Sequence, residues 1–75
     1  MAQHTYRILL TPEEGGGFSV SVPALPGCFT QGETVEEAIE MAREAISVYI
    51  ESLEDDGEPI PDDSKNLEYS LTLAL

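Results

Sequence analysis

Apolar and polar residues alternate in the first quarter of the chain, which is the pattern of half-buried β-strands. The stretch HTYRILLT covers residues 4–11, and FSVSV covers residues 18–22. A period of two places successive side chains on opposite faces of a sheet. Pro12 and the glycine-rich EEGGG lie between the two stretches and predict a reversing loop. The pattern therefore predicts a β-hairpin.

Two further extended segments are predicted. A short one is expected at residues 28–30, after a proline-rich loop. The other is LEYSLTLAL, residues 67–75, in which leucine or tyrosine alternates with smaller or polar residues. We expect this last stretch to form the final strand.

Between residues 35 and 54 the period changes to that of a helix. Apolar residues recur every three or four positions, as one face of an α-helix requires. Thr34 and Glu37 form a capping box at the start, and Gly57 and Pro59 stop the helix after residue 54. The apolar stripe consists of Val35, Ala38, Ile39, Ala42, Ala45, Ile46, Tyr49 and Leu53.

The stretch VPALPGCFTQGETVEEA, residues 22–38, joins the hairpin to the helix. Its prolines restrict the backbone and its glycines permit conformations that other residues resist. We interpret it as a corner that turns a strand into a helix. The residues given a structural role in this corner and in the loop before it are Gly17, Pro23, Pro26, Gly27, Cys28, Gly32, Thr34 and Glu37.

These elements predict a single α+β domain over residues 1–75. Its order is β-β-β-α-β, with one long helix packed on a three-stranded antiparallel sheet. A chain of 75 residues buries a small core, and its single cysteine excludes an internal disulfide. Small domains usually need additional stabilisation, so we expect a homo-oligomer, either a dimer or a tetramer.

The chain is strongly acidic. Fifteen acidic residues against three basic ones give a formal net charge of −12, which repels nucleic acids and anionic membranes. The charge fits either a basic protein partner or a role in solubility, or in a salty or hot environment. The start lacks a signal-peptide pattern and no stretch is apolar enough to span a membrane, which favours a cytoplasmic protein.

Residues that carry enzymatic chemistry are scarce, so we expect no catalytic residue, cofactor or metal. His4 lies near a terminus, and Cys28 has no neighbouring base to activate it. The segment EDDGEPIPDD lacks the order of ligands in an EF-hand. The carboxylates that we assign to contacts with a basic partner are Glu13, Glu14, Glu54, Asp55, Asp56, Glu58, Asp62 and Asp63.

Four motifs in a fixed order, GGFSVSVP, LPGC, TQGET and EEAIEMAREAI, resemble the HicB-like antitoxins of toxin–antitoxin pairs. The resemblance covers about three quarters of the chain. It implies a partial double-stranded-RNA-binding-domain-like fold in which a helix lies on a three-stranded antiparallel sheet. It also implies a type II antitoxin that neutralises a small basic HicA-like toxin, an mRNA-cleaving ribonuclease.

One departure from the family leaves an alternative open. Many members continue into a DNA-binding domain, whereas this sequence stops at Leu75 and is similar to a short form. The alternative is a stand-alone oligomeric binding or regulatory module without a toxin partner.

Overall fold

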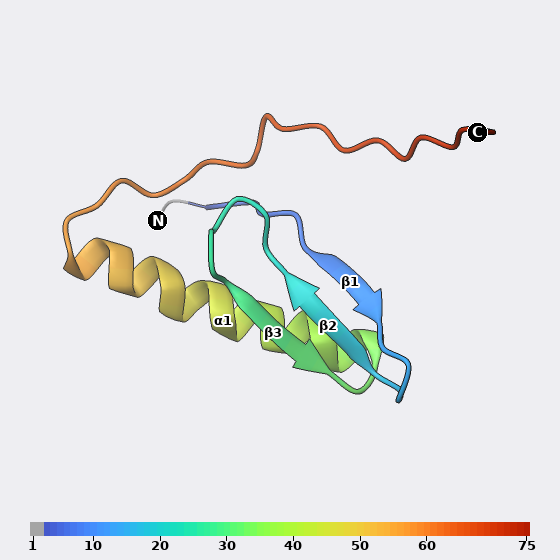
Figure 1. Cartoon of the computed structure of the whole chain (residues 1–75). Coiled ribbons are helices and arrows are strands. Elements are labelled where there is room, and N and C mark those ends of the chain that lie inside the picture. The colour runs from blue at the N-terminus through green and yellow to red at the C-terminus, as the bar shows by residue number, and fades with distance from the viewer. Residues whose placement is uncertain (1–2) are drawn as a thin grey trace.

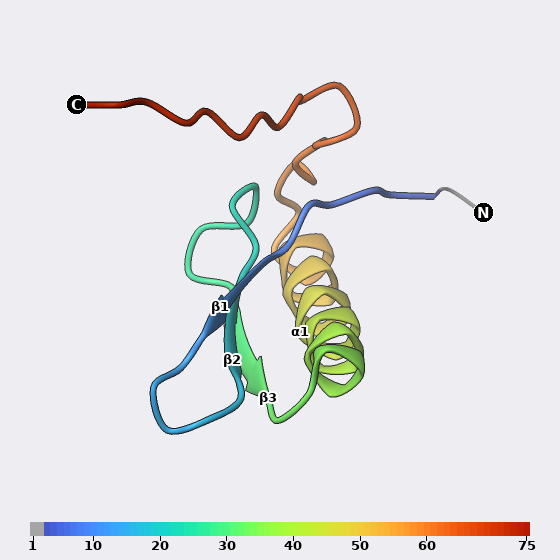
Figure 2. The same cartoon turned by 90° about the vertical axis from the view of Figure 1, so that its right-hand side faces the viewer.

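The computed structural model describes residues 3–75, in which three β-strands precede one long α-helix (Figure 1). The strands are β1 (Leu9–Pro12), β2 (Phe18–Ser21) and β3 (Phe29–Gly32), joined in that order as an antiparallel sheet. Helix α1 (Val35–Asp55) covers one face of the sheet (Figure 2). This arrangement confirms the predicted α+β fold.

The first half of α1 packs directly on the sheet. Ala38 and Ala42 are fully buried against Val20 of β2, with Ile8, Leu10 and Phe18 packed around them. Small helix residues at these positions let the two layers approach closely.

Gly32 shows how close this approach is at the start of the helix. A Cβ atom at this position would lie 2.5 Å from the backbone nitrogen of Ala38. Real Cβ atoms essentially never come within 3.0 Å of another heavy atom, so the contact excludes any side chain. Gly32 therefore permits the tight packing of the helix start against β3.

The second half of α1 extends beyond the strands and is covered by the corner between β2 and β3. Val22, Leu25 and Cys28 form a buried cluster against Ala45, Ile46, Tyr49 and Ile50 of the helix. Tyr6 and Ile8, which precede β1, complete this cluster. The corner loop thus continues the layer that the sheet begins.

Both ends of the helix are capped by local signals. The Thr34 hydroxyl accepts the N–H of Glu37, and the Glu37 carboxylate accepts the N–H of Glu33, one residue before the position usual in a capping box. At the other end, Glu58 N–H donates to the Leu53 carbonyl and Gly57 N–H to the Glu54 carbonyl. These two bonds, with Gly57 at φ +67°, make a Schellman motif.

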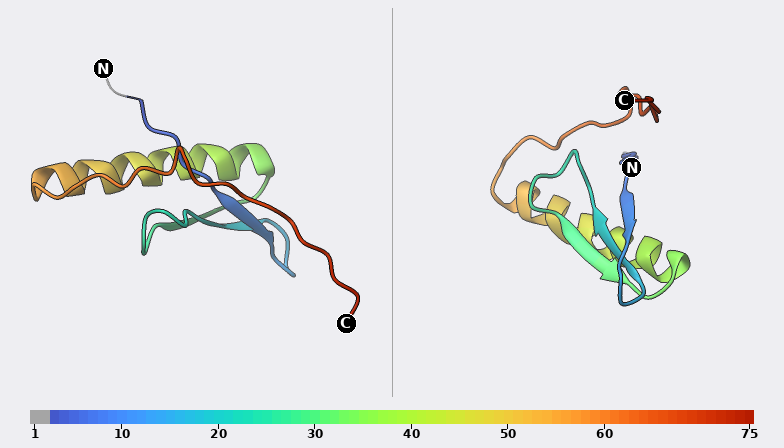
Figure 3. Two further views of the ribbon diagram at one scale, coloured as in Figure 1. Left: turned by 90° about the horizontal axis from the view of Figure 1, so that it is seen from above. Right: turned by 45° about the vertical axis from the view of Figure 1, so that its right-hand side comes forward.

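The predicted last strand is wrong for the single chain. Residues 67–75, which we call the leucine segment, pair with no described strand and run away from the body of the molecule (Figures 1 and 3). Alternation predicts which side chains share a face, but a strand also needs an edge to pair with, and the single chain leaves this one unpaired. The first strand is likewise shorter than predicted, because residues 4–8 form no ladder.

Candidate protein-interaction surface

Carboxylates line the face of α1 that points away from the sheet. The helix contains seven acidic residues and one basic residue, Arg43. Arg43 lies 3.6 Å from Glu40, but both side chains are 71% exposed, and ion pairs in water contribute little. This face therefore remains strongly negative. Its exposed members are Glu36, Glu40, Glu44, Glu51 and Glu54.

The carboxylates are densest where α1 ends. Glu54 and Asp55 lie in the last turn, Asp56 is the C-cap, and the turn holds no basic residue. A helix carries partial negative charge at its C-terminus, so each carboxylate there is unfavourable by about 0.3–1 kcal/mol. Such a local conflict is typical of functional surfaces. We call Glu54, Asp55, Asp56 and Glu58 the helix-end acids.

The other predicted contact residues fall elsewhere. Glu13 and Glu14 lie in the exposed loop between β1 and β2, at the end of the molecule where α1 begins (Figure 1). A helix of 21 residues is about 30 Å long, so this loop and the helix-end acids are separate patches. Asp62 is exposed, and hydrogen bonds from the side chain and backbone of Ser64 lower its pKa.

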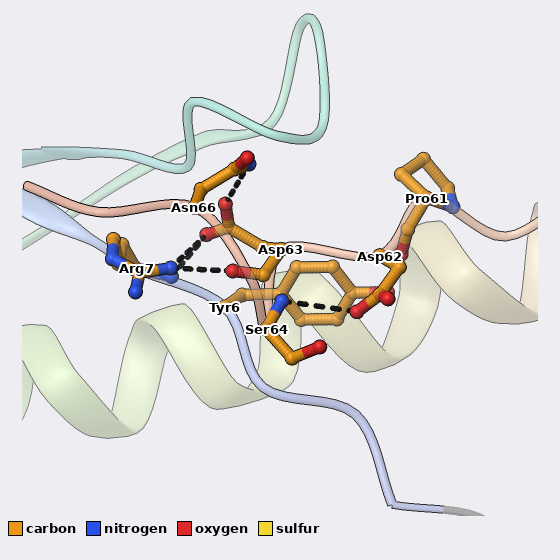
Figure 4. A network of polar contacts seen from close by, with 7 residues as sticks. All are labelled: Tyr6, Arg7, Pro61, Asp62, Asp63, Ser64 and Asn66. Atoms are coloured by element: carbon orange, nitrogen blue, oxygen red, sulfur yellow. Dashed lines mark hydrogen bonds and ion pairs between the residues drawn. The ribbon is translucent and has the colours of Figure 1, made fainter.

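Asp63 is set apart from the other predicted contacts because it is only 4% exposed. Its carboxylate accepts the backbone N–H of Arg7 at 2.8 Å and the side-chain amide of Asn66 at 2.6 Å (Figure 4). The Arg7 guanidinium lies 3.5 Å from the same carboxylate and donates to the Asp63 carbonyl. All of these bonds lie within the chain, so Asp63 is not offered to a partner.

Electrostatics around this network hold its groups in one ionisation state. The hydrogen bond from the Arg7 backbone, then that from Asn66, lowers the pKa of Asp63. Burial, then the charges of Asp62 and Asp63, raises the pKa of Tyr6, whose hydroxyl donates to the Pro61 carbonyl at 2.7 Å. At neutral pH Asp63 is therefore ionised and Tyr6 is protonated. No local sequence pattern predicts this network.

The corner loop is closed by backbone hydrogen bonds. Val22 N–H donates to the Cys28 carbonyl, Cys28 N–H to that of Leu25, and Leu25 N–H to that of Val22. Gly27 adopts φ +82°, and the Tyr49 hydroxyl fixes the loop to α1 by donating to the Pro26 carbonyl at 2.7 Å. The loop therefore lies as a folded corner over the helix.

Cys28 lies in the buried cluster beneath this loop. The thiol is shielded from solvent, and burial raises its pKa above the ordinary value. Reactive cysteines need the opposite environment, with a lowered pKa and partial exposure. The position of Cys28 matches that of a small core side chain.

An apolar groove of about 380 Å³ runs between β3 and α1. Phe29, Met41 and Val48 line it, and Phe29 and Val48 are 71% and 64% exposed. The groove gives the acidic surface an apolar neighbour, which is the usual composition of a protein-binding face.

Residues 3–75 contain neither a metal-binding cluster nor a membrane-spanning helix. No three His, Cys, Asp or Glu side chains among them are arranged to hold a metal ion. Within the same residues, no helix combines the length and hydropathy of a membrane span.

These features define the chain as a small acidic α+β domain whose exposed groups suit contacts with another protein. Residues 6–72 match the family described as HicB-like antitoxin of bacterial toxin–antitoxin systems, and the chain belongs to this family. A UPF0150 protein of Thermoplasma acidophilum is 52% identical over 59 residues, which cover 79% of this chain and 86% of that protein.

Solved structures agree with the family and the fold. The N-terminal domain of the Burkholderia pseudomallei antitoxin HicB is 31% identical with a TM-score of 0.67, and the match covers 91% of this chain and 72% of that one. A chain of the HicA3 and HicB3 toxin–antitoxin complex is 32% identical with a TM-score of 0.63, over 76% of this chain and 66% of that one.

Proposed function

We propose that this protein is a type II antitoxin that binds a small basic HicA-like toxin in the cytoplasm and blocks its cleavage of mRNA. The observation that carries the proposal is the family match over residues 6–72, supported by the likeness to a chain of the HicA3 and HicB3 complex. In this proposal the antitoxin acts by binding alone and contributes no catalytic group.

We assign the main contact to the helix-end acids. In the free chain, Asp55 and Asp56 are exposed and lie at the negative end of the helix dipole, where the last turn holds no basic residue. Lysine or arginine side chains of a toxin would relieve this repulsion as the complex forms. Complementary charge of this kind mainly raises the association rate, and salt screens it.

Glu13, Glu14 and Asp62 remain secondary contacts in this proposal. Glu13 and Glu14 lie at the opposite end of α1, so a toxin engaging the helix-end acids reaches them only if it extends along the acidic face of the helix. Asp62 lies four residues beyond Glu58 and is closer to the main contact in sequence. Asp63 is left out because its carboxylate is buried.

Two matched double variants test the assignment, with any small basic protein encoded beside this chain as the probe. Asp55→Asn with Asp56→Asn removes two charges at the helix end, and Glu13→Gln with Glu14→Gln removes two charges in the loop. We expect association at low salt to slow about tenfold for the first pair and to change only a few-fold for the second. The difference should shrink as salt is added.

Stability provides an independent readout with the opposite sign. Replacing Asp55 and Asp56 by amides should stabilise the free chain by about 0.3–1 kcal/mol per residue, because each replacement removes a negative charge from the negative end of the helix dipole. A variant that is more stable alone and yet binds more slowly cannot owe its weaker binding to misfolding. Absence of binding at low salt to any neighbouring basic protein would refute the proposed function.

A stand-alone binding module is the second candidate function. It is favoured by the leucine segment, whose large apolar side chains are exposed and whose composition does not suit a basic partner. A gene without a small basic reading frame beside it would favour this candidate over the antitoxin.

A further inference from the structure

The leucine segment has the composition of a strand and, in the single chain, no strand partner. Its large apolar side chains occupy every second position and are 63% exposed or more. The radius of gyration is 14.1 Å, compared with about 11 Å for a compact domain of this length, because the segment extends from the body. An exposed alternating segment of this kind is a template for pairing with another strand. Its exposed members are Leu67, Tyr69, Leu71, Leu73 and Leu75.

Charge indicates what kind of chain the segment accepts. Lys65 and Glu68 are the only charged residues in positions 64–75, and they cancel. The whole formal charge of −12 therefore falls on residues 1–63. A basic partner finds only Glu68 to recognise in this segment, whereas two copies of the acidic chain meet there with little repulsion.

A free sheet edge lies beside the segment. β1 is an outer strand, because β2 is its only strand partner among residues 3–75. The Glu13 N–H donates to the Gly17 carbonyl, so in this register the backbone groups of Leu9 and Thr11 point to β2. The N–H and carbonyl of Leu10 and the carbonyl of Pro12 point to the open side. A groove of about 410 Å³ lies between Leu67 and Tyr69 of the leucine segment and Leu9 and Pro23 at one end of the sheet. The edge is thus open to another strand.

The chain's own β1 is a poor match for the segment. Nine residues span about 30 Å when extended, whereas the four residues of β1 span about 13 Å. The segment also runs in the same general direction as β1 when seen from above (Figure 3). Pairing within the chain would therefore be parallel and would leave half of the segment exposed.

We propose that the leucine segment of one copy adds as an antiparallel strand to β1 of a second copy, and that the exchange is reciprocal. A two-fold axis perpendicular to the strands reverses the direction of the incoming segment, which makes the pair antiparallel. It also places the two leucine segments side by side. The residues of each segment that extend past β1 then pair with the leucine segment of the other copy. The product is a homodimer with one sheet running through both chains.

Adjacent substitutions on opposite faces of the segment test the proposal in the full-length chain. Leu71→Lys places a charge on the apolar face, and Thr72→Lys adds the same charge on the other face. Sedimentation equilibrium should find a dimer for the unmodified chain and for Thr72→Lys, and at least tenfold weaker self-association for Leu71→Lys. Leu71 is 81% exposed and lies outside both core clusters, so circular dichroism should show all three chains folded.

Nuclear Overhauser contacts in a dimer mixed from differently labelled chains locate the pairing. Contacts between residues 67–75 of one chain and Leu9 or Thr11 of the other are the expected result. A monomer would overturn the proposal. This holds whether the amides of the leucine segment are protected by β1 of the same chain or become protected only when a basic protein is added. A dimer that Leu71→Lys leaves intact would also overturn it.

Discussion

The Asp63 carboxylate accepts a hydrogen bond from the backbone N–H of Arg7, 56 positions earlier in the chain. This bond, with that from Tyr6 to Pro61, ties the segment after α1 to the residues that enter β1. The network includes Asn66, the residue directly before the leucine segment (Figure 4). One buried carboxylate therefore connects the packing of the domain with the position of its unpaired strand.

The attachment of residues 61–66 should depend on pH. Because folding lowers the pKa of Asp63 below its ordinary value of 3.8, its stabilisation is fully present above that value. It is lost as the pH falls through the lowered pKa. Hydrogen exchange and chemical shifts of residues 61–66 should therefore show loosening below about pH 4.

Asp63→Ala should cause the same loosening at neutral pH and remove its dependence on acid. Asp62→Ala is the matched control, because the Asp62 side chain is exposed and bonds only to its neighbour Ser64. Equal order of residues 61–66 in all three chains would show that the Asp63 carboxylate does not hold this segment.

Gly32→Ala should destabilise the fold strongly. The new Cβ would lie 2.5 Å from the Ala38 nitrogen and 2.9 Å from the Glu37 carbonyl carbon, and both are backbone atoms that cannot rotate away. We expect a loss of about 1–3 kcal/mol, measured by urea denaturation. Gly15→Ala is the control, since nothing lies within 4 Å of its Cβ position. A loss of the same size at Gly15 would contradict the close approach of α1 to β3.

Leu25→Ala should show that the corner loop belongs to the core. Leu25 is 0% exposed and packs in the cluster with Val22 and Cys28 beneath the second half of α1. Removing a buried leucine side chain typically costs about 2–5 kcal/mol. Phe29→Ala, which removes a larger side chain that is 71% exposed, should cost less than about 1 kcal/mol in the same denaturation experiment. The reverse order would mean that the loop is not packed as described.

The helix could be predicted from the sequence because its signals are local. Thr34 and Glu37 mark its start and Gly57 its end within a few residues, and the structure begins α1 at Val35 and caps it at Asp56. The pairing of residues 67–75 could not be predicted in the same way, because alternation encodes faces and not partners.

The candidate site was predicted only in part for a similar reason. The acidic residues of the candidate site are evident from the sequence. Their division into separate patches depends on the length of α1 and on where the loop between β1 and β2 lies. The burial of Asp63 depends on Arg7, and no local pattern relates two residues 56 positions apart. The role of Tyr49 in fixing the corner loop is also a long-range contact.

The thiol of Cys28 should report the opening of the corner loop. It is buried and its pKa is raised, so it should react slowly with a disulfide reagent such as Ellman's reagent while the chain is folded. Tyr49→Phe removes the hydrogen bond to the Pro26 carbonyl, a loss of about 0.5–1.5 kcal/mol. If the loop opens locally, this loss should raise the reaction rate about two- to tenfold.

Tyr69→Phe is the matched control for this experiment. Its side chain is 84% exposed and lies in the leucine segment, outside the buried cluster that contains Cys28. Removing its hydroxyl should leave the Cys28 reaction rate unchanged. Equal rates for Tyr49→Phe and the unmodified chain would show that Cys28 becomes accessible by a route other than release of the corner loop from α1, such as unfolding of the whole domain. In that case, the reaction rate in each variant should follow its global stability.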